Sequence, residues 1–147
     1  MRVNLIAAAL LLACGSATAQ ESDDYARMSR VSWAAFECAA FSSVLNEPKE
    51  QERLFRLGYD KGKEFLEALQ AGRIKGEDLY SISPSGFLML AQGPTPDFIL
   101  GRVFESAQEN ALKDVITSET VLEDELKKSI ASRKYQEGNC EVLGRGR

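Results

Sequence analysis

The sequence predicts an all-α fold: a small bundle of four long helices plus one or two short ones, joined covalently by one disulfide. Apolar side chains recur at helical spacing over most of residues 24–136, and no alternating run is long enough for a sheet. Two cysteines stand far apart in the chain. The chain of 147 residues is long enough for one ordinary domain and too short for two independent cores.

The long helices are expected over residues 24–46, 48–70, 96–116 and 118–136, with one helical turn over 77–81 and a short helix over 84–91. Proline suits the first turn of a helix, and serine or threonine before it suits the cap. These signals stand at Pro48, Ser83-Pro84 and Thr95-Pro96. Gly72 and Gly138 are the expected helix ends.

The composition excludes several classes of function. The net charge is −4 and the chain contains no histidine. Nucleic-acid binding is not expected, because it needs a concentrated basic surface. Without histidine, Ser-His and Cys-His catalysis and histidine-metal sites are excluded. No P-loop, G-x-G-x-x-G, G-x-S-x-G, S-x-x-K or EF-hand pattern occurs, so the sequence predicts no cofactor and no metal.

Residues 1–19 have the pattern of a secretory signal peptide. Arg2 precedes an apolar run over residues 5–13, and residues 17–19 (Ala-Thr-Ala) match an A-x-A cleavage site. The apolar run is shorter than the ~20 residues of a membrane-spanning helix. We therefore expect cleavage near Ala19 and a periplasmic or secreted protein.

Two forms of the processed chain are consistent with this leader. Cleavage after Ala19 leaves a single helical domain over residues 20–147. Alternatively, Leu11-Leu12-Ala13-Cys14 resembles a lipoprotein box, in which Cys14 would carry a lipid anchor. Both forms place the domain outside the cytoplasm.

The cysteines agree with export. Apart from Cys14, the chain has Cys38 and Cys140, an even pair that an oxidising compartment would join. Closing so long a loop stabilises a protein by about 4–5 kcal/mol in the chain-entropy model. The alternative is two buried free thiols.

The first long helix contains an isolated carboxylate. Residues 31–46 are apolar or small on all sides and carry one charge, Glu37, which is typical of a buried central helix. A carboxylate in such surroundings is costly unless it is paired, and such groups mark sites. Glu37 is therefore a candidate binding residue, and the alternative is an ion pair with Arg102 or Arg56.

The second long helix has two unlike faces. Gly58 and Gly62 lie one turn apart on the apolar side, and each costs about 1 kcal/mol of helix propensity. Close approach of another helix would compensate for that cost, whereas the alternative is a shallow groove for a ligand. Arg53, Arg56 and Asp60 belong to the opposite, charged face, which is either solvated or the rim of a protein-binding site.

A further candidate is the short helix over residues 84–91, which carries Phe87 and Met89. Apolar residues in an irregular connection either cover the core or form an exposed interaction patch. The sequence favours the first interpretation and leaves the second open.

No motif identifies the function. In size, leader and helix content the chain is similar to small exported bacterial helical proteins with one disulfide: periplasmic immunity proteins that neutralise toxins, acid-stress chaperones and phage-encoded envelope proteins. This likeness assigns no residue a role. We expect an envelope protein that binds another protein, as an inhibitor or immunity protein does, rather than an enzyme. Two alternatives stay open: a hydrolase of glycan or lipid that uses paired carboxylates, and a carrier of a small ligand.

Overall fold

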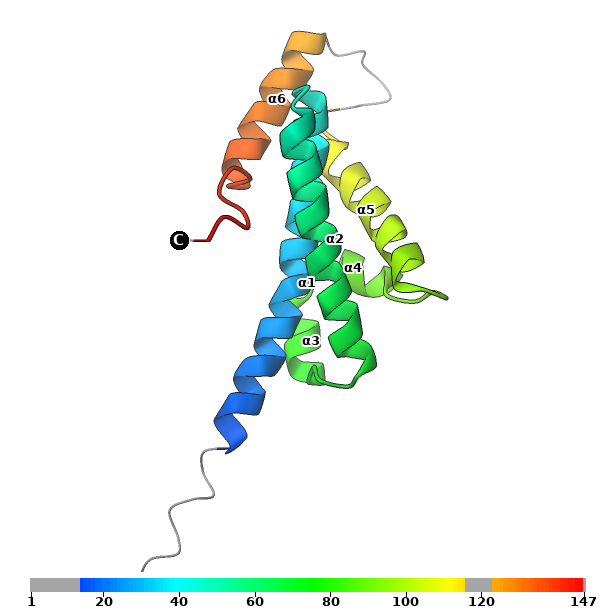
Figure 1. The fold of residues 1–147 in the computed structure, drawn as a ribbon. Helices are drawn as coiled ribbons and strands as arrows, with labels where there is room; N and C mark the ends of the chain where they lie inside the picture. The colour runs from blue at the N-terminus through cyan, green and yellow to red at the C-terminus, as the bar shows by residue number, and fades with distance from the viewer. Residues whose placement is uncertain (1–13, 116–122, 147) are drawn as a thin grey trace, which may run out of the picture.

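The computed structural model describes residues 14–115 and 123–146, and all the regular structure in these ranges is helical. The helices are α1 (Cys14–Val44), α2 (Pro48–Gln70), α3 (Gly76–Ile82), α4 (Ser85–Leu90), α5 (Pro96–Leu112) and α6 (Asp124–Glu137). Four are long and two are short, so the predicted all-α bundle is confirmed (Figure 1). No described helix combines the length and the apolar character needed to cross a membrane.

Helix α1 is the centre of the bundle. It runs through the middle of Figure 1 and contacts α2, α5, α6 and α3. Its inward side chains Ala35, Phe36, Ala39 and Ala40 are buried. A helix that has neighbours on several sides needs apolar side chains on several sides, which explains why residues 31–46 show no polar face.

Two groups of buried side chains form the interior. The first joins α1, α2, α4 and α5 and consists of Phe36, Phe65, Leu66, Phe87, Ile99, Leu100, Val103 and Ala107. The second joins α1, α2, α5, α6 and the turn after α6, and consists of Cys38, Ala39, Ala40, Phe41, Leu54, Ala111, Ala131 and Cys140. We call the first the core cluster and the second the disulfide cluster.

Helices α1 and α2 approach closely at the two glycines of α2. A Cβ atom on Gly58 would lie 2.6 Å from Phe36 Cδ1, and one on Gly62 would lie 2.7 Å from Ser32 Oγ. Ser32 Oγ also donates a 2.7 Å hydrogen bond to the carbonyl of Gly58. The apolar side of α2 therefore packs against α1 and leaves no groove at these glycines.

The connection after α2 is fastened to the start of α1. Ser22 is buried, and its Oγ donates to Asp78 Oδ2 (2.5 Å) and accepts from the backbone N–H of Lys75 (2.8 Å). The guanidinium of Arg73 lies 4.5 Å from the ring centre of Tyr25, and its Nη1 donates to the Tyr25 hydroxyl. Polar contacts therefore hold the connection and α3 against α1.

Several predicted boundaries are wrong. Helix α1 begins at Cys14 rather than residue 24, because no proline interrupts the intervening residues. Helix α4 begins at Ser85, and Pro84 is its N-cap, because Ser83 precedes a proline and takes the extended conformation. Thr95 caps α5 as predicted, accepting from the N–H of Phe98.

The second half of the chain differs from the prediction at two more places. Helix α5 ends at Leu112 instead of residue 116, and α6 begins at Asp124. The predicted start of the last helix at residue 118 lies outside the described residues, as do residues 1–13 of the expected leader.

Candidate binding surface

An aromatic cluster reaches the surface between α2 and α5. The ring centres of Phe55 and Phe104 are 5.1 Å apart with perpendicular planes, and Phe104 is 5.3 Å from the buried Phe36. Phe55 also stacks on Tyr59 at 6.5 Å and is 40% exposed. The core cluster therefore continues outwards into an accessible aromatic surface.

Further exposed residues lie on α5, beside the aspartate that Tyr59 contacts. Tyr59 donates a 2.6 Å hydrogen bond to Asp97, which ties α2 to the first turn of α5 and raises the pKa of the Tyr59 hydroxyl. Phe98, the next residue, is 51% exposed. We call this area the aromatic face and define it as Phe55, Tyr59, Phe98, Gly101, Arg102 and Phe104.

No other part of the described chain packs against Gly101. A Cβ atom built there would meet no heavy atom within 4 Å, in contrast to Gly58 and Gly62. A glycine inside a helix costs about 1 kcal/mol relative to alanine. At Gly101 no close packing within the described chain offsets that cost, so the exposed side of α5 has an open position there.

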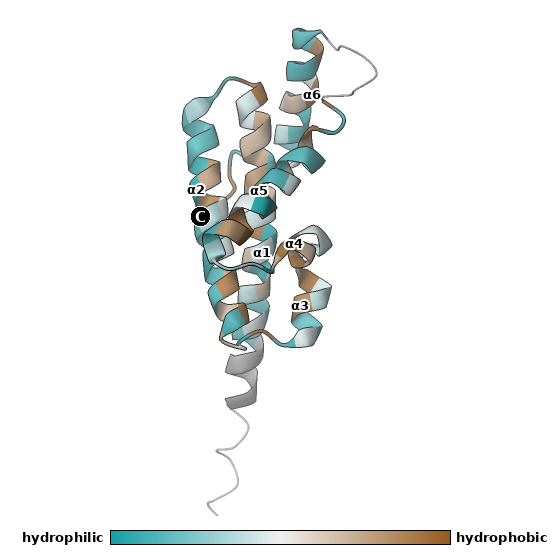
Figure 2. Ribbon diagram, turned by 90° about the vertical axis from the view of Figure 1, so that its right-hand side faces the viewer, coloured by the Kyte–Doolittle hydropathy of each residue, from teal (hydrophilic) through white to brown (hydrophobic). Residues whose placement is uncertain are grey.

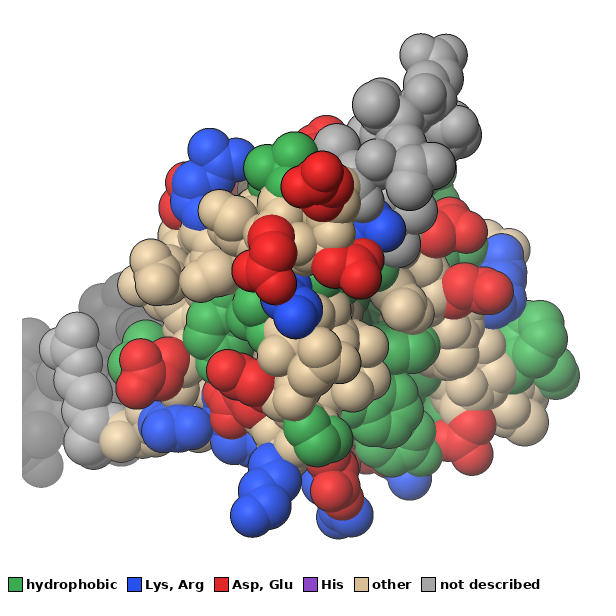
Figure 3. Space-filling model, turned by 90° about the horizontal axis from the view of Figure 1, so that it is seen from above, with side chains coloured by type: hydrophobic (Ala, Val, Ile, Leu, Met, Phe, Trp, Pro, Cys, Tyr) green, Lys and Arg blue, Asp and Glu red, His purple; other side chains and the backbone are tan. Residues whose placement is uncertain are grey.

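Arg102 provides the positive charge of this face. Its guanidinium lies 5.7 Å from the ring centre of Phe98, and Nη1 donates to the carbonyl of Gln92. Within residues 14–115 and 123–146, no carboxylate forms an ion pair with it. Figure 3 shows hydrophobic side chains gathered at the lower right, on the α2 and α5 side, with charged side chains around them.

Two residues of the predicted charged face border the aromatic face. Arg56 and Asp60 are exposed on α2, next in sequence to Phe55 and Tyr59 respectively. Arg56 forms a 2.7 Å ion pair with Glu52. The sequence indicated these charges but missed the exposed aromatic residues beside them, because alternating charged and aromatic residues on one helix do not show which of them a neighbouring helix covers.

The predicted arginine partner of Glu37 is wrong. Glu37 is half-buried and accepts a 2.6 Å hydrogen bond from Asn110 Nδ2 of α5, while Arg56 pairs with Glu52 and Arg102 bonds to a carbonyl. The amide satisfies the carboxylate without a counter-charge because Glu37 keeps partial access to water. Glu37 therefore lies at a contact between α1 and α5.

The two apolar candidates in α4 have different environments. Phe87 is fully buried in the core cluster, where its ring packs edge-on against Phe65 at 5.1 Å. Met89 is 77% exposed. Helix α4 thus covers the core with one side and presents the other to solvent.

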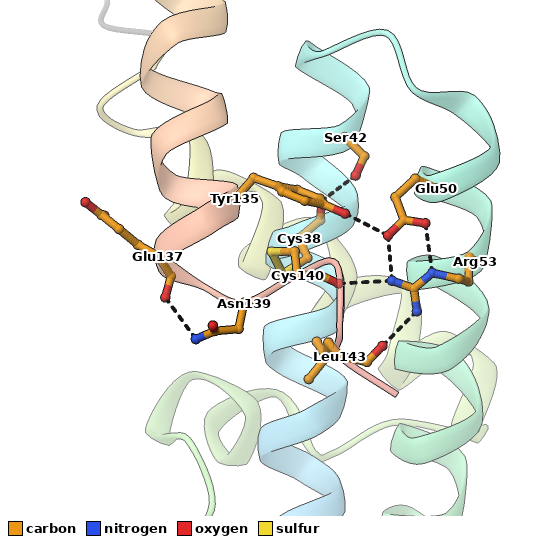
Figure 4. Close-up of a disulfide and its surroundings, with 9 residues drawn as sticks. All are labelled: Cys38, Ser42, Glu50, Arg53, Tyr135, Glu137, Asn139, Cys140 and Leu143. Atoms are coloured by element: carbon orange, nitrogen blue, oxygen red, sulfur yellow. Dashed lines mark hydrogen bonds and ion pairs between the residues drawn. A yellow bond between two sulfur atoms is a disulfide. The ribbon is translucent and has the colours of Figure 1, made fainter. Parts of the chain in front are cut away.

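Arg53 belongs to a separate polar cluster near the disulfide (Figure 4). Its Nε and Nη2 donate to the two carboxylate oxygens of Glu50 at 2.8 and 2.6 Å. Its Nη1 donates to the carbonyl of Leu143 (2.7 Å), and Nη2 also donates to that of Cys140 (3.0 Å). Tyr135 donates to Glu50 from α6 at 2.7 Å. We call this set the Arg53 clamp.

The clamp shifts the titration of its members. The hydrogen bond from Arg53 is the main cause that lowers the pKa of Glu50 from 4.5 to about 2, against the opposing effect of burial. Burial first, and the hydrogen bond to Glu50 second, raise the pKa of Tyr135 to about 12. The carboxylate is therefore charged and the phenol neutral over the ordinary pH range.

The sequence placed Arg53 on a solvated face and did not find the clamp. The three-residue spacing of Glu50 and Arg53 on a helix predicts their ion pair. Cys140 and Leu143 lie 87 and 90 positions after Arg53 in the sequence, so no local pattern predicts these contacts.

Cys38 and Cys140 form the predicted disulfide, with their Cα atoms 5.5 Å apart. Both side chains are buried, and because their sulfur atoms are bonded, the alternative of two buried free thiols is wrong. The bond attaches the turn after α6 to the C-terminal part of α1.

Among the described residues, no group of three or more carboxylate or cysteine side chains is arranged to hold a metal ion. A surface depression of about 420 Å³ runs along α5 and is lined by Glu105, Gln108, Glu109, Leu112 and Lys113. Four of its five lining residues have charged or amide side chains.

Comparison with known proteins gives no relative: no family model, no curated protein and no solved structure matches this chain.

Proposed function

We propose that this protein is an exported binding protein of the bacterial envelope that engages another protein through its aromatic face, as an inhibitor or immunity protein does. The observation that carries the proposal is the composition of that face. It combines exposed aromatic rings, an arginine that pairs with no carboxylate among the described residues and a glycine that none of those residues covers.

This composition is typical of the energetic centre of protein interfaces. Aromatic residues and arginine dominate such centres. Aromatic rings bury a large area at a small cost in side-chain entropy, and the planar guanidinium of arginine donates several hydrogen bonds in a fixed geometry. Phe98 and Arg102 lie one helical turn apart on α5, and Gly101 beside them permits a partner backbone to approach closely. Arg102 favours a partner that presents a carboxylate next to an apolar side chain.

Export is supported by the leader pattern and by the disulfide, since such bonds persist in oxidising compartments. Cleavage after Ala19 would also suit α1. The first described side chain of α1 that is buried is Ser22, and the new first turn would contain Glu21, Asp23 and Asp24. Acidic side chains there interact favourably with the positive end of the helix dipole.

Photo-crosslinking in the producing bacterium tests the binding surface. A photoreactive amino acid at Phe98 or Phe55 is expected to give a discrete cross-linked product with one partner protein. The matched control is Tyr80 on α3, an aromatic residue that is 77% exposed and lies outside the aromatic face. No product from the face, or the same product from Tyr80, would refute the proposal.

Intact-mass measurement of the protein expressed with its leader tests export. The expected mass is that of residues 20–147 with one disulfide, recovered from the envelope fraction. A lipid-modified chain beginning at Cys14 would support the anchored form. A full-length chain with reduced cysteines in the cytoplasm would contradict export.

A further inference from the structure

Arg53 holds the backbone at and after Cys140. Its Nη2 donates to the carbonyl of Cys140 itself, and Nη1 donates to the carbonyl of Leu143, three residues further on. Both carbonyls belong to the turn that follows α6, whereas Cys38 lies on α1 and Arg53 on α2. Helix α2 therefore fixes the position of Cys140 through contacts that involve neither sulfur (Figure 4).

The guanidinium of Arg53 is itself held in place. Glu50 accepts two hydrogen bonds from it, and the Glu50 side chain is only 16% exposed. Tyr135 and Arg145, from α6 and the segment after it, also contact Glu50, at 2.7 and 3.4 Å. Hydrogen bonds between charged groups are about twice as strong as neutral ones, so this set is a specific anchor for the turn.

Few apolar side chains attach this region: Ala131 and Cys140 are buried in the disulfide cluster, and Tyr135 and Leu143 pack against it. Ala131 is the one residue of α6 that is buried, and Figure 2 shows most of α6 in the hydrophilic colour. Gly138 leaves space for the disulfide, since a Cβ atom there would lie 3.2 Å from Cys140 Sγ. Without the disulfide, the Arg53 clamp is thus a principal contact that keeps Cys140 beside Cys38.

We propose that Arg53 is a positioning residue for the disulfide. The clamp holds the turn around Cys140 beside α1 in the reduced protein, and it thereby raises the equilibrium constant for formation of the Cys38–Cys140 bond. This inference goes beyond the proposed function and does not depend on it. It concerns a chemical step of the chain's own maturation.

The step is thiol–disulfide exchange with a small disulfide oxidant, for which oxidised glutathione is the probe. One cysteine thiolate attacks the oxidant, forms a mixed disulfide and releases one glutathione thiolate. The second cysteine thiolate attacks the mixed disulfide, closes the Cys38–Cys140 bond and releases the second. Two electrons pass from the protein to the oxidant, and the released thiolates take up the two protons that the cysteines lost.

The test is the equilibrium constant of the Cys38–Cys140 bond against glutathione, measured by trapping free thiols in defined redox buffers. Arg53→Met removes all five donors and is expected to lower the constant at least about tenfold, which corresponds to about 1.4 kcal/mol. Arg53→Lys keeps the charge without the planar fork and is expected to give an intermediate constant.

Arg56→Met is the matched control. Arg56 lies on the same helix three residues later, pairs with Glu52 and has a side chain that is 73% exposed. Its replacement is expected to leave the constant unchanged. If R53M lowers thermal stability but has the same constant as R56M, Arg53 is only a structural residue and the proposal is overturned. Should R53M fail to fold, R53K and Tyr135→Phe replace it, and unchanged constants in both overturn the proposal equally.

Discussion

The α1–α2 pair and the α6 region are attached to the molecule in opposite ways. Along α1 and α2 the attachment is close packing, with two glycines that admit Phe36 and Ser32 to the backbone of the partner helix. The α6 region has one buried residue in its helix and is attached by a disulfide, an arginine clamp and the Lys134–Asp114 ion pair. A helix with little apolar area can therefore hold a fixed position when covalent and charge-assisted contacts replace burial.

The largest expected effect comes from removing the disulfide. Cys38→Ser with Cys140→Ser is expected to cost about 4 kcal/mol, since the bond closes a long loop of the unfolded chain. Hydrogen exchange should accelerate first in α6 and the turn after it, while α1 and α2 keep their protection. Equal acceleration in both regions would show that they form a single cooperative unit.

Replacing Gly62 and Gly101 by alanine compares a closely packed glycine with an exposed one. Gly62→Ala is expected to destabilise the protein by about 1–3 kcal/mol, because its methyl group would meet Ser32 Oγ and the side chain of Leu100. Gly101→Ala meets nothing in the described chain and is expected to stabilise it by up to about 1 kcal/mol. Urea unfolding measures both, and effects of the same sign would contradict the assigned roles of the two positions.

Acid should weaken the α6 region before the α1–α2 pair. The pKa of Glu50 is about 2 in the folded protein and 4.5 when unperturbed, so the folded state holds its proton less tightly than the unfolded one. Its stabilisation is present above pH 4.5 and is lost as the pH falls towards 2. The expected loss is about 2 kcal/mol in this partly solvated cluster.

Unfolding of Glu50→Gln from pH 7 to pH 2 measures that contribution. The variant is expected to show a flatter pH profile than the parent over this interval. An identical slope would mean that other carboxylates account for the acid sensitivity.

The smallest effect on stability is expected at the aromatic face. Phe98→Ala and Arg102→Ala remove exposed side chains and should change the free energy of unfolding by no more than about 0.5 kcal/mol. Both should abolish the cross-link formed from Phe55. Met89→Ala, at a residue 77% exposed on α4, is the control that should leave the cross-link intact.

The core of this fold was predictable from sequence because its determinants are local. The apolar run of α1, the amphipathic pattern of α2 and the Thr95-Pro96 helix start each act within one element. The number of cysteines predicted the disulfide, since Cys38 and Cys140 are the two that remain outside the expected leader. Gly58 and Gly62 indicated a close helix contact through their cost alone.

The candidate site was less predictable because it depends on which residues the packing leaves uncovered. Phe55 and Phe104 have the pattern of core residues, yet Phe55 remains 40% exposed although its ring lies beside Phe36 and Phe104. Phe87 and Met89, two residues apart on α4, have opposite environments that composition does not distinguish. Arg53 was misassigned for the same reason, since its partners at Cys140 and Leu143 are distant in sequence.

The Ser22 contacts have a consequence for how the molecule loses its structure. One buried hydroxyl joins the early turns of α1 to both the backbone that starts α3 and a carboxylate within it. If the beginning of α1 frays, α3 loses these hydrogen bonds, and the packing of its Leu79 against the core cluster loosens with it. Local unfolding at the start of α1 would thus first destabilise α3, which lies more than fifty residues further along the chain.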